Sequence, residues 1–154
     1  MQRRSFLKGT LAGSAVAVAV GAGLLSPRTV LAAWPKAAFE AKSVEAAMSK
    51  LFGSAASTPS ADIKIKAPDI AENGAVVPVS ISTTMGNVDS IAVIAEKNGT
   101  PLASNFKLGA NTVANVSTRI KMGKTSDVIA VVKANGKAYS ARKNVKVTIG
   151  GCGG

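Results

Sequence analysis

DVIAVVKANGKAYSARKNVKVTI, residues 127–149, is the stretch of sequence that decides the fold class. It is divided by Asn135-Gly136, the dipeptide most typical of the two-residue turn in a β-hairpin. The β-branched run 128–132 precedes this turn, and a strand that contains Tyr139 follows it. Apolar and polar residues then alternate up to Ile149, so we expect a sheet to hold the backbone until about that residue.

The same alternation of apolar and polar residues extends toward the N-terminus. The expected strands are 63–66, 77–81, 90–95, 102–108, 112–122, 128–133 and 137–149. Turn dipeptides such as Asn73-Gly74 and Asn98-Gly99 separate them, and Pro78 predicts an edge strand or a bulge. Short strands without helices between them predict a mainly β chain, folded as an immunoglobulin-like antiparallel β-sandwich over residues 61–149. The cysteine and tryptophan landmarks of antibody domains are absent.

A single amphipathic helix is predicted ahead of the strands. Pro35 suits an early helical position and Gly53 suits the C-terminal stop. Between them, apolar residues recur at helical spacing, at Val44, Met48, Leu51 and Phe52. We expect this stripe to pack on the rest of the domain. Small polar residues at 55–60 form a connector, so the N-terminal helix and its connector together occupy residues 34–60.

Residues 1–33 have the layout of a secretory signal peptide, with a basic start, an apolar stretch at 11–25 and a small-residue end. The apolar stretch is short and rich in Ala and Gly, which favours cleavage over a membrane anchor and leaves no membrane span. The start resembles the twin-arginine export motif, whose residues here are Arg3, Arg4, Phe6, Leu7 and Lys8. That pathway exports folded proteins, so we expect a periplasmic protein that folds fast or leaves the cytoplasm bound to a partner.

Composition excludes several functional classes. The chain has no His, which removes the usual general base and the commonest transition-metal ligand, and its single Cys cannot complete a zinc site or an internal disulfide. We therefore expect neither a metal nor a cofactor. Without the four basic residues of the leader, 15 Lys and Arg face 8 Asp and Glu, a charge of about +7. Basic residues scattered along the strands, with few aromatic residues among them, argue against nucleic-acid binding.

The last five residues form the candidate site: Gly150, Gly151, Cys152, Gly153 and Gly154. Four glycines leave this arm with little conformational preference, and five extended residues reach about 17 Å beyond the sheet. An ordinary thiol is largely protonated at neutral pH, and no neighbour of Cys152 activates it. We therefore expect a flexible swinging arm on which Cys152 is a covalent attachment point, activated by whichever protein receives it, in a protein that is not an enzyme.

Two other interpretations of the terminal thiol remain. Cys152 is incidental, or it forms a disulfide that joins an exported β-sandwich binding or structural module to another chain. Against an incidental role, an exposed thiol oxidises readily and forms unwanted cross-links. Mass additions of sulfur units on Cys152 would separate a carrier from a disulfide-linked module.

A family resemblance becomes specific at this point. The twin-arginine leader, the helix before a small sandwich and the Gly-Gly-Cys-Gly-Gly terminus at 150–154 resemble the SoxY family, the sulfur carriers of the periplasmic thiosulfate-oxidising Sox system. The resemblance implies that thiosulfate is coupled oxidatively to Cys152 by the c-type haem enzyme SoxXA. The manganese enzyme SoxB would then release sulfate and leave a persulfide, with SoxCD as a further candidate partner. It also implies a SoxYZ heterodimer with SoxZ, a second sandwich protein that lacks a leader.

Overall fold

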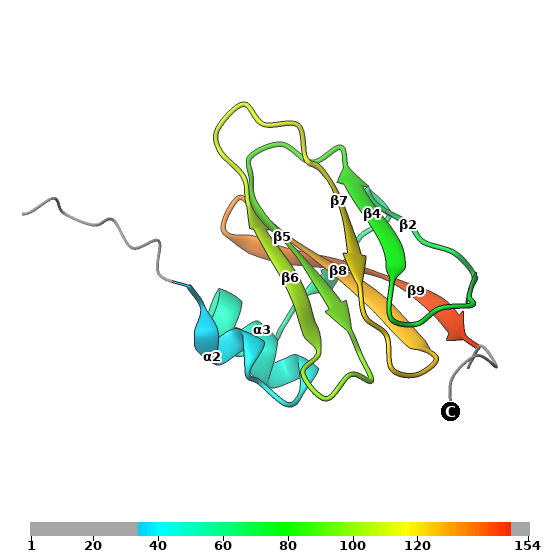
Figure 1. Ribbon diagram of the computed structural model, residues 1–154. Helices are drawn as coiled ribbons and strands as arrows, with labels where there is room; N and C mark the ends of the chain where they lie inside the picture. The colour runs from blue at the N-terminus through cyan, green and yellow to red at the C-terminus, as the bar shows by residue number, and fades with distance from the viewer. Residues whose placement is uncertain (1–33, 149–154) are drawn as a thin grey trace, which may run out of the picture. The chain divides into compact units, whose positions relative to one another are not determined.

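The computed structural model describes residues 34–148 (Figure 1). The predicted signal peptide, with Arg3, Arg4, Phe6, Leu7 and Lys8, lies outside the described residues, as do Ile149 and the glycine arm that carries Cys152. Within 34–148, two short helices precede two packed sheets. The mainly β sandwich expected from the sequence is confirmed.

The larger sheet has the strand order β1-β9-β8-β5-β6, and β3 also pairs with β9. Its strands are β1 Thr58–Pro59, β3 Ile70–Ala71, β5 Val88–Ala95, β6 Leu102–Lys107, β8 Ser126–Ala134 and β9 Lys137–Val147. The hairpin β8–β9 turns at Asn135 and Gly136, whose φ values of 51° and 74° are both positive, as a type I′ hairpin turn requires. The side chain of Asn87 donates to Oδ1 of Asn135 at 3.1 Å and steadies this turn.

The smaller sheet has the order β2-β4-β7, formed by β2 Ile63–Lys66, β4 Val77–Thr83 and β7 Asn115–Ile120. Pro78 therefore lies in the central strand, where an edge strand or a bulge was expected. It is tolerated because β2 flanks β4 only from Ser80 onward, so Pro78 has a neighbouring strand on the β7 side alone. The expectation of an edge is correct locally and wrong for the strand as a whole.

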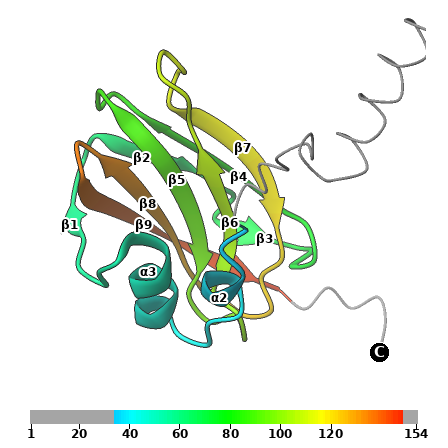
Figure 2. The same cartoon turned by 90° about the vertical axis from the view of Figure 1, so that its left-hand side faces the viewer.

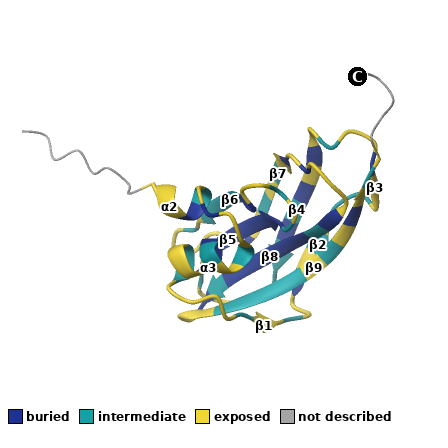
Figure 3. Cartoon of the chain, turned by 90° about the horizontal axis from the view of Figure 1, so that it is seen from below, coloured by how far each residue is buried: buried dark blue, intermediate teal, exposed yellow. Residues whose placement is uncertain are grey.

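The main core fills the space between the two sheets. Side chains from the inner faces of both are almost fully buried, and they include Ile81, Val79, Ile91, Val93 and Val132. Figure 3 shows the consequence, since β8 is buried along nearly its whole length while β2 and β9 show exposed residues. The sandwich is thus held by apolar burial across the two sheets.

The predicted single helix is two helices, α2 Lys36–Phe39 and α3 Val44–Phe52. The helix is interrupted before Ser43, whose backbone is extended and whose Oγ accepts a hydrogen bond from Ala46 N at 3.1 Å. Ser43 is thus an N-cap, a start signal that the apolar spacing concealed. Gly53 ends α3 with a positive φ of 81°, as predicted.

The helices cover the outer face of the larger sheet and add a third layer (Figure 2). Met48 and Ala47 of α3 pack with Ile94 of β5 and with Ile129 and Val131 of β8. The apolar stripe of the predicted helix therefore packs on the domain as expected. β5 and β8 are covered on both faces, so their sequences are almost continuously apolar. The outer strands, in contrast, alternate between apolar and polar residues.

Two short pairings at the edge of the larger sheet are parallel, and neither strand was expected from the sequence. β1 and β3 both run parallel to β9, with Thr58 opposite Tyr139 and Ile70 opposite Lys146. Each is two residues long, too short to show a period of two in the sequence. The predicted connector 55–60 thus contains β1. No helix within residues 34–148 is long and apolar enough to span a bilayer.

Candidate functional site at the end of the last strand

The structure describes the base of the predicted arm, because β9 ends at Val147 and the description ends at Thr148. Cys152 and its four glycines lie outside the described residues. The described residues include the segment that holds the chain just before the arm. We call residues 145–148 the arm base.

One side of the arm base is held by the segment around β3. Lys146 N donates to Asp69 O at 2.9 Å, and Thr148 N donates to Ala71 O at 3.1 Å. These parallel-strand hydrogen bonds continue one residue past the end of β9. Because Ala71 is buried, this anchoring strand is itself fixed in the core. The backbone is therefore fixed up to the last residue described.

The other side of the arm base is held by Thr125, which lies in the β7–β8 connection. Its Oγ1 accepts a hydrogen bond from Val147 N at 2.9 Å and lies 3.4 Å from Val147 O, to which the hydroxyl donates. The side chain thus satisfies both backbone polar groups of Val147. Two residues before Val147, Val145 is fully buried opposite Ser126 of β8. The thiol arm therefore starts from a strand end that is hydrogen-bonded on both edges.

Gly74 packs directly against the arm base. Its carbonyl accepts a hydrogen bond from Met122 N at 2.7 Å. A Cβ at this position would collide with the carbonyl oxygen of Met122 and with Cγ1 of Val147. The turn at Asn73-Gly74 was predicted from the sequence, whereas this close approach was not. Nothing in the local sequence near residue 74 indicates that residues 122 and 147 would meet there.

Covalent geometry limits where the thiol can act. Cys152 follows Thr148 by four residues, which span at most about 14 Å when extended. A sulfur tethered on this length to a fixed strand end reaches past the sheet while staying close to the surface around the arm base. That surface exposes two apolar side chains, Ile70 at 56% and Val76 at 50%. It also carries an ion pair between the partly buried Lys143 and the exposed Asp69, with 3.1 Å from Nζ to Oδ1.

Within 34–148, no group of three or more His, Cys, Asp or Glu side chains is arranged to hold a metal ion. Two acidic side chains at this end of the sandwich, Glu96 and Asp127, lie close to one arginine. Arg142 Nη1 lies 3.1 Å from Glu96 Oε1 and 3.9 Å from Asp127 Oδ2. The sequence identified Cys152 as the candidate site, and the structure adds Thr125, Gly74 and the β3 segment as its support.

Comparison with known proteins shows that the chain matches one protein family. The model of the family described as sulfur oxidation protein SoxY matches residues 48–152, a span that ends on Cys152. Among solved structures, the sulfur carrier protein SoxY from Chlorobium limicola f thiosulfatophilum is 41% identical, with a TM-score of 0.61 over 67% of this chain and 94% of that chain.

A second structure shares the fold alone. A superoxide reductase (neelaredoxin) from Ignicoccus hospitalis is 19% identical, with a TM-score of 0.50 over 56% of this chain and 79% of that chain. No curated protein matches the chain. The family model spans more than half of the sequence, and the Chlorobium protein shares sequence and fold with it. The chain belongs to the SoxY family of sulfur oxidation proteins.

Proposed function

We propose that this protein is a covalent carrier of sulfur intermediates in thiosulfate oxidation, and that the intermediates are bound at Cys152. The observation that carries the proposal is the family match, which runs through the sandwich and ends on the chain's only thiol. The fixed arm base supports it, because a carrier needs a stable body from which a short tether extends. The protein supplies no catalysis of its own.

The chemistry asks little of the carrier. The Cys152 thiolate and the outer sulfur of thiosulfate form an S–S bond, and two electrons pass to a partner oxidant, for which we propose the haem enzyme SoxXA. Water then cleaves the bond between the terminal sulfonate and the adjacent sulfur. Sulfate leaves and a persulfide stays on Cys152; we propose SoxB for this hydrolysis. The carrier contributes the nucleophile in the first step, and its persulfide is the leaving group in the second. In both steps the sulfur fits a narrow cleft, because glycine adds no side chain beside it.

We also propose the setting in which the carrier works. The twin-arginine motif at residues 3–8 supports export to the periplasm as a folded protein. A second subunit without a leader, as the Sox resemblance implies for SoxZ, would leave the cytoplasm bound to this chain. SoxCD is proposed to act on the persulfide after sulfate has left.

A cysteine substitution tests the carrier role. Cys152→Ala is expected to unfold at the same temperature as the wild type, because residues 34–148 fold without it, and to abolish thiosulfate-dependent electron transfer in a reconstituted Sox system. Intact mass of the wild type after turnover should show sulfur additions on Cys152. Full turnover by Cys152→Ala rejects the proposal. A plain interchain disulfide, required for function and without sulfur adducts, would assign the protein to the structural class instead.

A further inference from the structure

Four lysines line one cavity at the end of the sandwich where β9 ends. The cavity has a volume of about 600 Å³ and is lined by Lys42, Lys97, Asn98, Gly99, Thr100, Lys121, Gly123 and Lys124. These residues come from three connections, α2–α3, β5–β6 and β7–β8, which lie together at one end of the domain (Figure 1). We call this cavity the lysine pocket.

Asn98 gives the lysine pocket a defined frame. Its Nδ2 donates to Lys121 O at 2.6 Å, and its Oδ1 accepts a hydrogen bond from Gly123 N at 3.0 Å. One side chain thus joins the β5–β6 turn to the β7–β8 connection. The backbone N–H of Asn98 donates to Ala95 O at 3.1 Å. The lysines therefore project from connections that are tied to each other.

The positive charge of the lysine pocket is not neutralised by the described part of the chain. None of its four lysines lies within 4.0 Å of a carboxylate among residues 34–148, and no carboxylate lines the cavity. Glu96, next in the chain to Lys97, is engaged by Arg142, as is Asp127 at the start of β8. Like charges gathered around one cavity repel each other, and a bound anion relieves that repulsion.

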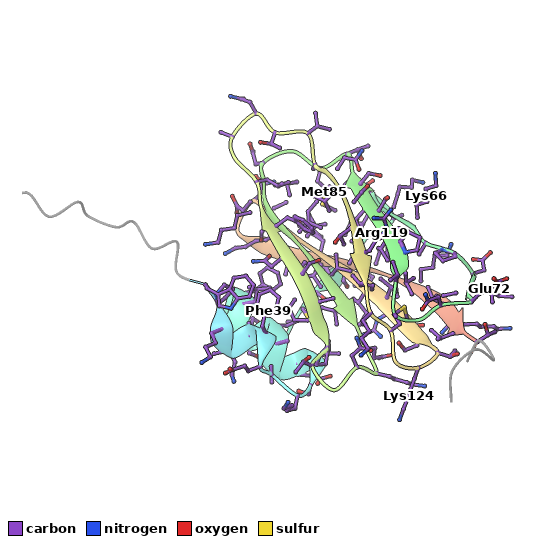
Figure 4. All side chains as sticks on the ribbon, viewed as in Figure 1. Phe39, Lys66, Glu72, Met85, Arg119 and Lys124 are labelled. Carbon is purple, nitrogen blue, oxygen red and sulfur yellow. The ribbon has the colours of Figure 1, made fainter. Side chains whose placement is uncertain are left out.

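The lysine pocket and the arm base share the β7–β8 connection. Lys124 precedes Thr125, whose hydroxyl holds Val147 at 2.9 Å. From Val147 to Cys152 is five residues, an extended reach of about 17 Å. Figure 4 shows Lys124 on one side of the end of β9 and Glu72 on the other. An anionic group on the arm is therefore attracted toward the lysine pocket and repelled from the Glu72 side.

We propose that the lysine pocket binds the terminal sulfonate of the thiosulfonate adduct on Cys152. This inference rests on the proposed carrier function, since it gives the adduct a resting site on the carrier's own surface. A sulfonate offers three oxygen acceptors, and lysine ammonium groups with the Thr100 hydroxyl and backbone N–H groups are suitable donors. Bound there, the S–S bond is shielded from free thiols between encounters with partner enzymes.

The adduct can be prepared without any Sox enzyme. The Cys152 thiolate attacks an inner sulfur of tetrathionate, an S–S bond forms to Cys152, and thiosulfate leaves with the electron pair of the broken S–S bond. Tetrathionate is thus itself the two-electron oxidant, and no other is needed. In two-dimensional NMR of the full protein, the adduct is expected to shift the amide of Gly123 and the side-chain amide of Asn98. The same resonances should move when free thiosulfate is titrated into Cys152→Ser.

Paired charge variants supply the control. Lys97→Gln with Lys121→Gln removes two charges from the lysine pocket, and Lys64→Gln with Lys66→Gln removes two from the outer face of the smaller sheet, which lines another cavity. Release of the adduct by dithiothreitol should be about two- to thirtyfold faster in the pocket variant, the effect of losing two exposed charge pairs of ordinary strength. The control variant should match the wild type.

Three results overturn the proposal: no adduct-dependent shift at Gly123 and Asn98, equal release rates in the two variants, or shifts caused by free thiosulfate but not by the adduct. The last would assign the pocket to incoming substrate. Because tetrathionate forms the adduct chemically, failure of the lysine pocket leaves the carrier function standing. Conversely, absence of Cys152 adducts in the reconstituted system would refute the carrier while the shift experiment still reports on the pocket.

Discussion

Replacing Gly74 by alanine tests whether the arm base is packed as tightly as its contacts indicate. The added methyl would meet a backbone carbonyl, that of Met122, and a short side chain, that of Val147, and neither can move freely. Gly74 also accepts a hydrogen bond from Met122 N at 2.7 Å, so a shift that relieves the clash weakens this bond. Overpacking of this kind costs about 1–3 kcal/mol. For a domain of this length, the melting temperature should fall by roughly 4–12 °C.

The measurement is urea unfolding followed by far-ultraviolet circular dichroism, with the midpoint expected to fall at an unchanged slope. Gly99→Ala is the matched control, because a Cβ at Gly99 meets nothing within 4 Å. It should stay within about 0.5 kcal/mol of the wild type. If Gly74→Ala is as stable as Gly99→Ala, the close approach of Gly74 to Met122 and Val147 is not a feature of the folded protein, and the reasoning about the arm base is refuted.

Three further substitutions probe the support of the arm base, the helix layer and the hairpin turn. Thr125→Val keeps the shape but leaves Val147 N–H without its partner, so amide hydrogen exchange at Val147 should accelerate about fivefold, for a bond worth about 1 kcal/mol, while Thr125→Ser should not change it. Met48→Ala should destabilise the domain by about 2–5 kcal/mol in urea unfolding, against almost no change for Val113→Ala, whose side chain is 80% exposed. Asn135→Ala, at a φ of 51°, should cost about 1–2 kcal/mol, and recovery of stability by Asn135→Gly would show that backbone conformation is the cause; equal losses would contradict this.

The carrier proposal and the lysine pocket assign different roles to the C-terminal arm and to the sandwich. On these proposals, the arm presents the sulfur to partner enzymes. The sandwich fixes the point from which the arm extends and supplies the surface that a charged adduct contacts. Thr125 connects the arm base to the lysine pocket, because its hydroxyl accepts a hydrogen bond from Val147 N and it directly follows Lys124, which lines the pocket. A variant that loosens Thr125 should therefore change the kinetics of adduct release as well as the stability of the arm base.

Sequence alone was sufficient for the features that depend on local pattern. The Asn135-Gly136 turn, the alternation along the outer strands and the glycine-flanked thiol at residue 152 are all decided within a few neighbouring residues. Turn chemistry and side-chain alternation are local properties of the backbone, so they can be read without knowing the fold. The class of the fold and the position of the candidate thiol followed from them.

Other features were decided only when distant segments packed together. The two-residue strands β1 and β3 exist only because β9 offers them free backbone groups. Gly74 beside Val147, and four lysines from three connections around one cavity, are likewise juxtapositions of residues far apart in the chain. Such contacts carry no local signature, since the energy that selects them comes from burial and hydrogen bonding across the whole sandwich.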